Sequence, residues 1–288
     1  MPSVAILLAV SAAAAWAIGM TAAKPGVRTM DPITYTVARW SLVSILAFIY
    51  ALVMNRLAFP GWWPIFLAAL AGFLDCTLGG LFYLLSMQRS SAYRATTLSS
   101  TAPLWGVLGA ILMLGEPLLW RVVLAVVLVI VGSVFLAERR QPAKSGAWLG
   151  GALALLTGVL WGFAETVPAK LALDEGLSPE SLLLVFALSG ALSMAALLPF
   201  LRKRIPRQVE RRGFAFVVLS AVGGAFLGWL LWLHALNLAP ASVISPIRGL
   251  TLLFALAYSV VFLRERPPRR ALLGIALVLC GIVLVSFS

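Results

Sequence analysis

Four ionisable side chains interrupt segments that are otherwise apolar: Asp75, Glu165, His234 and Arg248. An ionisable group is costly in hydrocarbon, so in an apolar segment it faces a partner or a wet cavity rather than lipid. Carboxylate and guanidinium groups on different segments can together bind the ammonium and the carboxylate of a zwitterion. The sequence therefore predicts a charged site inside the apolar part of the molecule.

Aromatic residues accompany these charges at helical spacing. Trp161 precedes Glu165 by four residues, which places both side chains on one face of a helix, and Asp75 shares a face with Phe82. Aromatic rings in such positions can stack against an apolar or aromatic ligand. The candidate binding residues are Trp16, Asp75, Tyr83, Trp161, Glu165, Trp232, His234 and Arg248.

Each candidate also has a structural interpretation. Arg248 either pairs with Glu165 or Asp75, binds a substrate carboxylate, or reaches the outer surface along its own helix. His234, the only histidine, is a hydrogen-bonding residue at a helix end or a proton carrier. The tryptophans are packing residues or interface anchors if they do not line a cavity.

The chain offers no group that is typical of an enzyme. Cys76 and Cys280 are isolated, a single histidine is present and the carboxylates are scattered, so neither a nucleophile with its base nor a set of metal ligands is indicated. No Walker A string occurs, which argues against direct use of ATP. We expect no catalytic residue, no metal and no cofactor.

The composition places these residues in a bilayer. Hydrophobic residues make up 62% of the 288 residues, charged residues only 11%, and the mean hydropathy is +1.02. We predict an all-α integral membrane protein, and we expect its first apolar segment to be retained because no basic residue precedes it. Ten apolar runs have the length of a span: 3–22, 33–54, 64–86, 93–114, 118–136, 147–169, 180–200, 213–236, 242–263 and 270–287.

The net charge of +12 is unevenly distributed. Of the 22 Lys and Arg residues, 18 lie in the odd-numbered connections or at the adjoining helix ends, where we count Arg39, and 3 lie in the even-numbered ones. Basic residues are retained on the cytoplasmic side, so both termini are expected outside. The charge thus indicates the lipid surface and no nucleic acid.

The second half of the chain repeats the first. Moving residues 83–136 by 149 positions, without a gap, sets Glu116 on Glu265 and Gly132 on Gly281. The predicted division is a first five-helix repeat at 1–137, a linker at 138–145 and a second repeat at 146–288. Five spans per repeat invert the second one in the membrane, and such repeats are typical of transporters with a central cavity.

Turn residues mark the ends of the predicted spans. Glu116 and Glu265 each precede the last span of a half, and we expect them to cap neighbouring backbone groups. Pro103 and Pro246 interrupt the fourth and ninth spans, as hinges or as fixed kinks.

Several of these features together resemble a known family. The junctions FYLLSMQRSSAYRATTLSSTAPLW and LWLHALNLAPASVISPIRGL, the tryptophan in the first helix of each half and the Gly-Glu or Arg-Glu turn before each last helix resemble the EamA-type branch of the drug/metabolite transporter superfamily. The resemblance covers essentially the whole chain. It implies an inverted repeat of five plus five helices around a central cavity.

The resemblance also implies a function and a location. Its members export small metabolites, amino acids among them, so we expect a small-molecule substrate and a position in the inner membrane of a bacterium. An aromatic or other apolar amino acid suits the candidate residues, and a cationic drug or a lipid-linked substrate is the alternative. Members of this size are usually drawn with cytoplasmic termini, whereas the loop charges here favour periplasmic ones.

Overall fold

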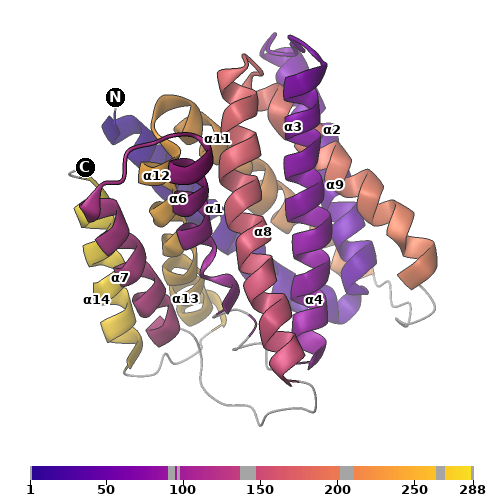
Figure 1. The fold of residues 1–288 in the computed structure, drawn as a ribbon. Helices are drawn as coiled ribbons and strands as arrows, with labels where there is room; N and C mark the ends of the chain where they lie inside the picture. Colours follow the sequence, from indigo (N-terminus) through magenta and orange to yellow (C-terminus); the bar gives the residue numbers. More distant parts are fainter. Residues whose placement is uncertain are drawn as a thin grey trace.

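The computed structural model describes residues 2–89, 95, 98–136, 147–201, 211–263 and 270–286, and the regular elements in these residues are all helical (Figure 1). Seven helical stretches are long and apolar enough to cross a membrane: Ser3–Ala23, Pro32–Val53, Trp62–Ser86, Trp148–Asp174, Pro179–Phe200, Gly213–Leu238 and Ala241–Phe262. Ala102–Met113 and Trp120–Gly132 are shorter apolar helices. The chain is thus a multi-helix membrane protein, and ten spans stay a prediction.

The helices of the first part are α1 (Pro2–Thr29), α2 (Pro32–Val53), α3 (Trp62–Gly72), α4 (Gly80–Arg89), α6 (Ala102–Met113) and α7 (Trp120–Leu136). Those of the second part are α8 (Ala147–Asp174), α9 (Pro179–Leu201), α10 (Arg211–Leu219), α11 (Leu227–Leu238), α12 (Ala241–Ile244), α13 (Leu250–Leu263) and α14 (Arg270–Ser286).

Two predicted spans differ from the structure. The run 93–114 contains α6, which begins only at Ala102, with Pro103 in its first turn. The run 242–263 matches the candidate span Ala241–Phe262, but this span is built from α12, a 3-10 segment at Ser245–Gly249 and α13 and is not one continuous α-helix. Because proline lacks an N–H, it fits the first turn of a helix, and each proline marks such a beginning.

Local sequence signals set several helix ends. Asp31 accepts a hydrogen bond from the backbone N–H of Thr34 (2.9 Å) and so caps α2, with Pro32 in its first turn. After α8, Gly176 has φ +87° and Leu177 N–H reaches the carbonyl of Ala172 (3.0 Å), the left-handed ending that glycine favours.

A π-helical segment joins the two pieces of the third helix of each half. Phe73–Gly79 lies between α3 and α4, and Ser220–Phe226 lies between α10 and α11. A π segment widens the helix by one residue and often occurs at functional sites. The first of these segments carries Asp75.

Helices from the two halves lie side by side. Figure 1 shows α7 against α14 and α8 against α6 and α4, and α2 runs along α9. In the first pair, Gly132 makes room for Val278 and Gly281 makes room for Val129. Close helix packing at small residues is typical of membrane bundles.

The outer faces of the helices are apolar. Leu52, Leu112 and Phe200 are more than half exposed, as are many other large apolar side chains. Patches of this kind are rare on soluble monomers and match contact with lipid tails.

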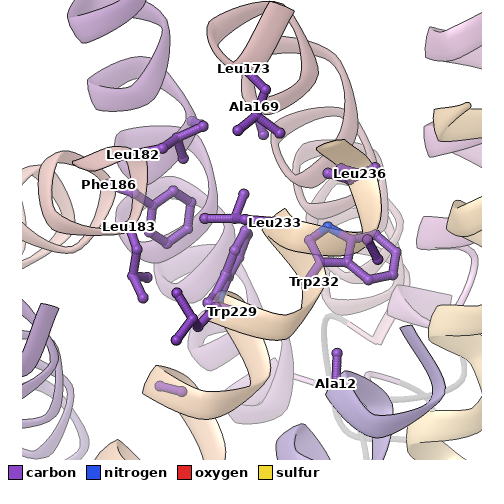
Figure 2. Packing of buried hydrophobic residues seen from close by; sticks show 14 of the residues in the cluster. Ala12, Ala169, Leu173, Leu182, Leu183, Phe186, Trp229, Trp232, Leu233 and Leu236 are labelled. Carbon is purple, nitrogen blue, oxygen red and sulfur yellow. The ribbon is translucent and has the colours of Figure 1, made fainter. Parts of the chain in front are cut away.

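Buried side chains fill one side of the bundle, where α8 ends and α9 begins (Figure 2). Phe186 of α9 lies against Trp229 of α11, with ring centroids 4.1 Å apart, and Leu182 and Leu233 are fully buried beside them. Gly72 lets α3 approach the backbone of α9 closely here, because a Cβ at this position would lie 2.1 Å from the carbonyl oxygen of Phe186. This side is therefore closed by close packing.

Candidate functional site

A cavity of about 410 Å³ lies in the middle of the bundle, within the size range of small-molecule sites. Its walls come from both halves of the chain: α1, α2, the π segment, α4 and α6 on one hand, and α8, α11, the 3-10 segment and α13 on the other. It reaches Ala23 near the end of α1 and Pro32 at the start of α2. The cavity thus extends toward the side of the odd-numbered connections, opposite the closed core.

Glu165 and Arg248 form an ion pair at the cavity wall. The Nη2 of Arg248 donates to Oε1 of Glu165 (2.7 Å), and its Nε donates to the other carboxylate oxygen. The α8 helix supplies the acid, and the 3-10 segment after Pro246 supplies the guanidinium. Only 4% of the Glu165 side chain is exposed, so each charge depends on the other. Of the roles considered for Arg248, this geometry matches pairing with Glu165.

Two tryptophans flank the same guanidinium. The Cζ of Arg248 lies 5.8 Å from the ring centroid of Trp16 and 5.5 Å from that of Trp161. At these distances the ring faces attract a cation. The two rings come from α1 and α8, the first helices of the two halves.

Glycines and second rings fix both tryptophans. Trp161 lies over Gly79, donates its indole N–H to the carbonyl of Asp75 (3.2 Å), and contacts Tyr83 at 5.2 Å between centroids. Trp16 lies over Gly228, with Trp232 also at 5.2 Å. A Cβ at either glycine would overlap the indole, at 2.7 Å and 2.4 Å respectively, so glycine is required at both positions.

Asp75 faces the cavity next to the ion pair. It is buried, lines the same cavity as Glu165, and accepts a weak hydrogen bond from the Cys76 thiol (3.7 Å). Two acids therefore line the cavity: Glu165 is paired with Arg248, and Asp75 has no ion pair among the described residues.

Arg39 is a second cation in the cavity wall, which the sequence interpretation missed. Its helix, α2, starts at Pro32, so Arg39 lies about two turns inside it and not at a loop. Including Arg39 among the basic residues of the odd-numbered connections was therefore wrong, because α2 begins at Pro32 and Arg39 lies inside it. The neighbours Tyr35, Thr36 and Trp40 also line the cavity, and this aromatic and polar run was the available signal.

Six of the eight predicted site residues line the cavity, and two lie elsewhere. Trp232 is fully buried behind Trp16 and donates its indole N–H to the carbonyl of Glu165 (3.0 Å). His234 lies on the closed side, with Nε2 3.3 Å from the carboxylate of the buried Glu180. Trp232 therefore supports the cavity wall, His234 belongs to the closed side, and neither residue faces the cavity.

Polar contacts join helices on the closed side as well. The carboxylate of Glu116 accepts hydrogen bonds from the backbone N–H groups of Ala241 (2.7 Å) and Ser242 (2.8 Å) at the start of α12. Glu116 thus caps backbone groups as predicted, but in the other half of the chain. Glu265 lies outside the described residues.

No group of three His, Cys, Asp or Glu side chains that could hold a metal is found in the described part of the chain. Cys76 is buried and Cys280 exposed, both as free thiols. The cavity wall offers charged groups and aromatic surface to a ligand.

The profile of the EamA-like transporter family matches this chain twice, over residues 3–137 and 148–287. The chain belongs to the EamA-like transporter family. The resemblance drawn from the sequence motifs is thereby confirmed, and with it a role as a transporter in a membrane.

Relatives of this EamA-like chain carry the same general description. An "uncharacterized transporter" of Archaeoglobus fulgidus is 26% identical over 287 residues, covering 97% of each chain. An "uncharacterized transporter" of Helicobacter pylori strain 26695 is 25% identical over 217 residues, 73% of this chain and 70% of that one. A solved crystal structure superposes with a TM-score of 0.82 at 17% identity, over 98% of this chain and 96% of that chain, which shows a shared fold.

Proposed function

We propose that this EamA-like transporter exports amino acids with aromatic or other apolar side chains across the cytoplasmic membrane, by alternating access. The observation that carries the proposal is the charge balance of the cavity. Arg39 and Arg248 face Asp75 and Glu165 between aromatic walls. A zwitterion brings both signs of charge and leaves this balance unchanged.

The same balance argues against other substrates. A cationic drug could approach the acids but would bring no anion for the two guanidinium groups, whose like charge would repel it in a low-dielectric site. A lipid tail would gain nothing from the four charged groups that line the cavity. The rings of Trp16, Tyr83 and Trp161 suit a planar or apolar side chain of the substrate.

Alternating access requires two related halves, and we propose ten spans arranged as inverted repeats, 1–137 and 146–288, joined by a linker at 138–145. Paired contacts support this arrangement. Trp161 lies over Gly79 and Trp16 over Gly228, glycines that are 149 residues apart. Tyr83 and Trp232, also 149 residues apart, contact these same two tryptophans. The two separate matches of one family profile agree with this division.

We further propose that both termini are periplasmic and the odd-numbered connections cytoplasmic, which would make this structure an inward-facing state. A reporter fused after Ser288 is expected to read as periplasmic, and one inserted at 202–212 as cytoplasmic, because basic loops stay inside. The measurement is paired phosphatase and fluorescent-protein activity in cells. A cytoplasmic reading after Ser288 would reverse the orientation.

The substrate is tested by flux in proteoliposomes. Loaded with a panel of labelled amino acids, vesicles with the wild-type protein are expected to release phenylalanine and tryptophan faster than lysine, aspartate or a cationic dye. Protein-free vesicles give the background, and a pH gradient shows whether protons are coupled. Selective release of the dye or of a lipid, with no amino-acid flux, would contradict the proposal.

A further inference from the structure

Resting on the proposed function, we propose that Arg39 binds the carboxylate of the substrate, whereas Arg248 holds the cavity wall in place. The ammonium of the same substrate is then received by the carboxyl pair of Asp75 and Glu165. Opposite ends of one zwitterion are then bound by α2 on one side and by the π segment Phe73–Gly79 and α8 on the other.

The first step is that the guanidinium of Arg39 has a hydrogen-bond donor that no described residue uses. Its side chain lines the cavity, and its Nε is buried without a hydrogen-bond partner in the described structure. No ion pair connects its guanidinium to a described carboxylate. Its recorded ring contact is with its own neighbour Trp40, at 5.1 Å from the centroid. A guanidinium fork in this state is a site for a planar anion such as a carboxylate.

The second step is that Arg248 is already committed. Both its Nε and its Nη2 donate to the carboxylate of Glu165, and two indole rings cover its faces. A substrate carboxylate at Arg248 would have to displace Glu165, leaving that buried acid unpaired. Arg39 offers the same chemistry without this cost.

The third step is the position of the acids. Asp75 and Glu165 line the same cavity as Arg39, and both are buried. Asp75 has no ion pair among the described residues, so together with Glu165 it offers carboxyl oxygens that a substrate ammonium can approach. The cation of α2 and this acid pair thus frame a substrate that carries both charges on one carbon.

The experiment separates the carboxylate from the ammonium with three related molecules. Flux of labelled phenylalanine is measured in proteoliposomes, with phenethylamine (no carboxylate) and 3-phenylpropionate (no ammonium) as competitors. The variants are Arg39→Gln and Arg39→Lys. The matched control is Arg121→Gln, which removes an exposed guanidinium on α7 outside the cavity.

Arg39→Gln is expected to raise the KM for phenylalanine about 10- to 100-fold, since a charge-assisted contact is lost. It should abolish inhibition by 3-phenylpropionate while leaving inhibition by phenethylamine within about twofold of wild type. Arg39→Lys keeps the charge without the fork, so an intermediate KM and retained anion inhibition are expected. Arg121→Gln should match wild type.

An unchanged KM in Arg39→Gln, or equal weakening of both competitors, would overturn the assignment while leaving amino-acid export intact. If Arg39→Gln does not reach the membrane, Arg39→Lys decides: wild-type KM for phenylalanine would then contradict a forked carboxylate contact. A wild-type protein that moves no amino acid overturns the proposed function itself and this assignment with it.

Discussion

Arg248→Ala is expected to lower the stability of the folded protein by about 3–5 kcal/mol, because it leaves the carboxylate of Glu165 buried without its partner. The double variant Arg248→Met with Glu165→Leu removes both charges and keeps most of the volume, so it should recover most of that loss. The measurement is thermal unfolding of the purified protein in detergent. The difference between the single and the double variant isolates the ion pair.

Transport measurements distinguish the contribution of this ion pair to stability from its contribution to substrate binding. The double variant is expected to fold but not to transport. It lacks the Glu165 carboxylate, one of the two acids proposed to receive the ammonium, and it lacks the Arg248 guanidinium that lies between Trp16 and Trp161. A single Arg248→Ala variant as stable as wild type would show that Glu165 does not need Arg248. A double variant that transports at the wild-type rate would remove both residues from the site.

Gly162→Ala is expected to destabilise the protein by about 3 kcal/mol or more, since an added methyl group would overlap main-chain atoms. A Cβ at this position would lie 2.1 Å from the carbonyl oxygen of Ala102 and 2.9 Å from the backbone nitrogen of Gly106. Both atoms belong to α6, which cannot yield as a flexible side chain would. The substitution therefore separates α6 from α8, which together form one wall of the cavity.

Gly61→Ala is the matched control for this prediction. The same methyl group added at Gly61 meets no heavy atom within 4 Å, and the backbone there is extended. Folded yield and midpoint of thermal unfolding should fall for Gly162→Ala and stay near wild type for Gly61→Ala. Equal values for the two variants would mean that α6 and α8 do not pack as closely as described.

The sequence was sufficient for the class of protein and for much of the charged and aromatic lining of the cavity. Apolar composition requires a bilayer, and the cost of a charge in hydrocarbon identified Asp75, Glu165 and Arg248 as residues that need partners or water. The helical repeat placed Trp161 beside Glu165. All four line the cavity. The sequence could place these residues because solvation and contacts within a single helix act along the chain.

Other features were beyond the sequence because they depend on contacts between distant segments. Glu116 lies in a predicted turn, but its hydrogen-bond partners Ala241 and Ser242 are more than a hundred residues away along the chain. His234 looked like a member of the charged site, and only the packing of α9 on α11 brings it to Glu180. The π segment that carries Asp75 has no pattern of its own in the apolar run.

What the sequence by itself determined is the membrane class, the family and a set of charged and aromatic candidates, because solvation, composition and internal repetition act along the chain. What only the tertiary structure decided is how the charges are shared. Arg248 belongs to Glu165, while Arg39, two turns inside α2, is left facing the cavity. The physical reason is that an ion pair requires two side chains to meet in space, and which acid a given arginine meets is set by the packing of helices from both halves.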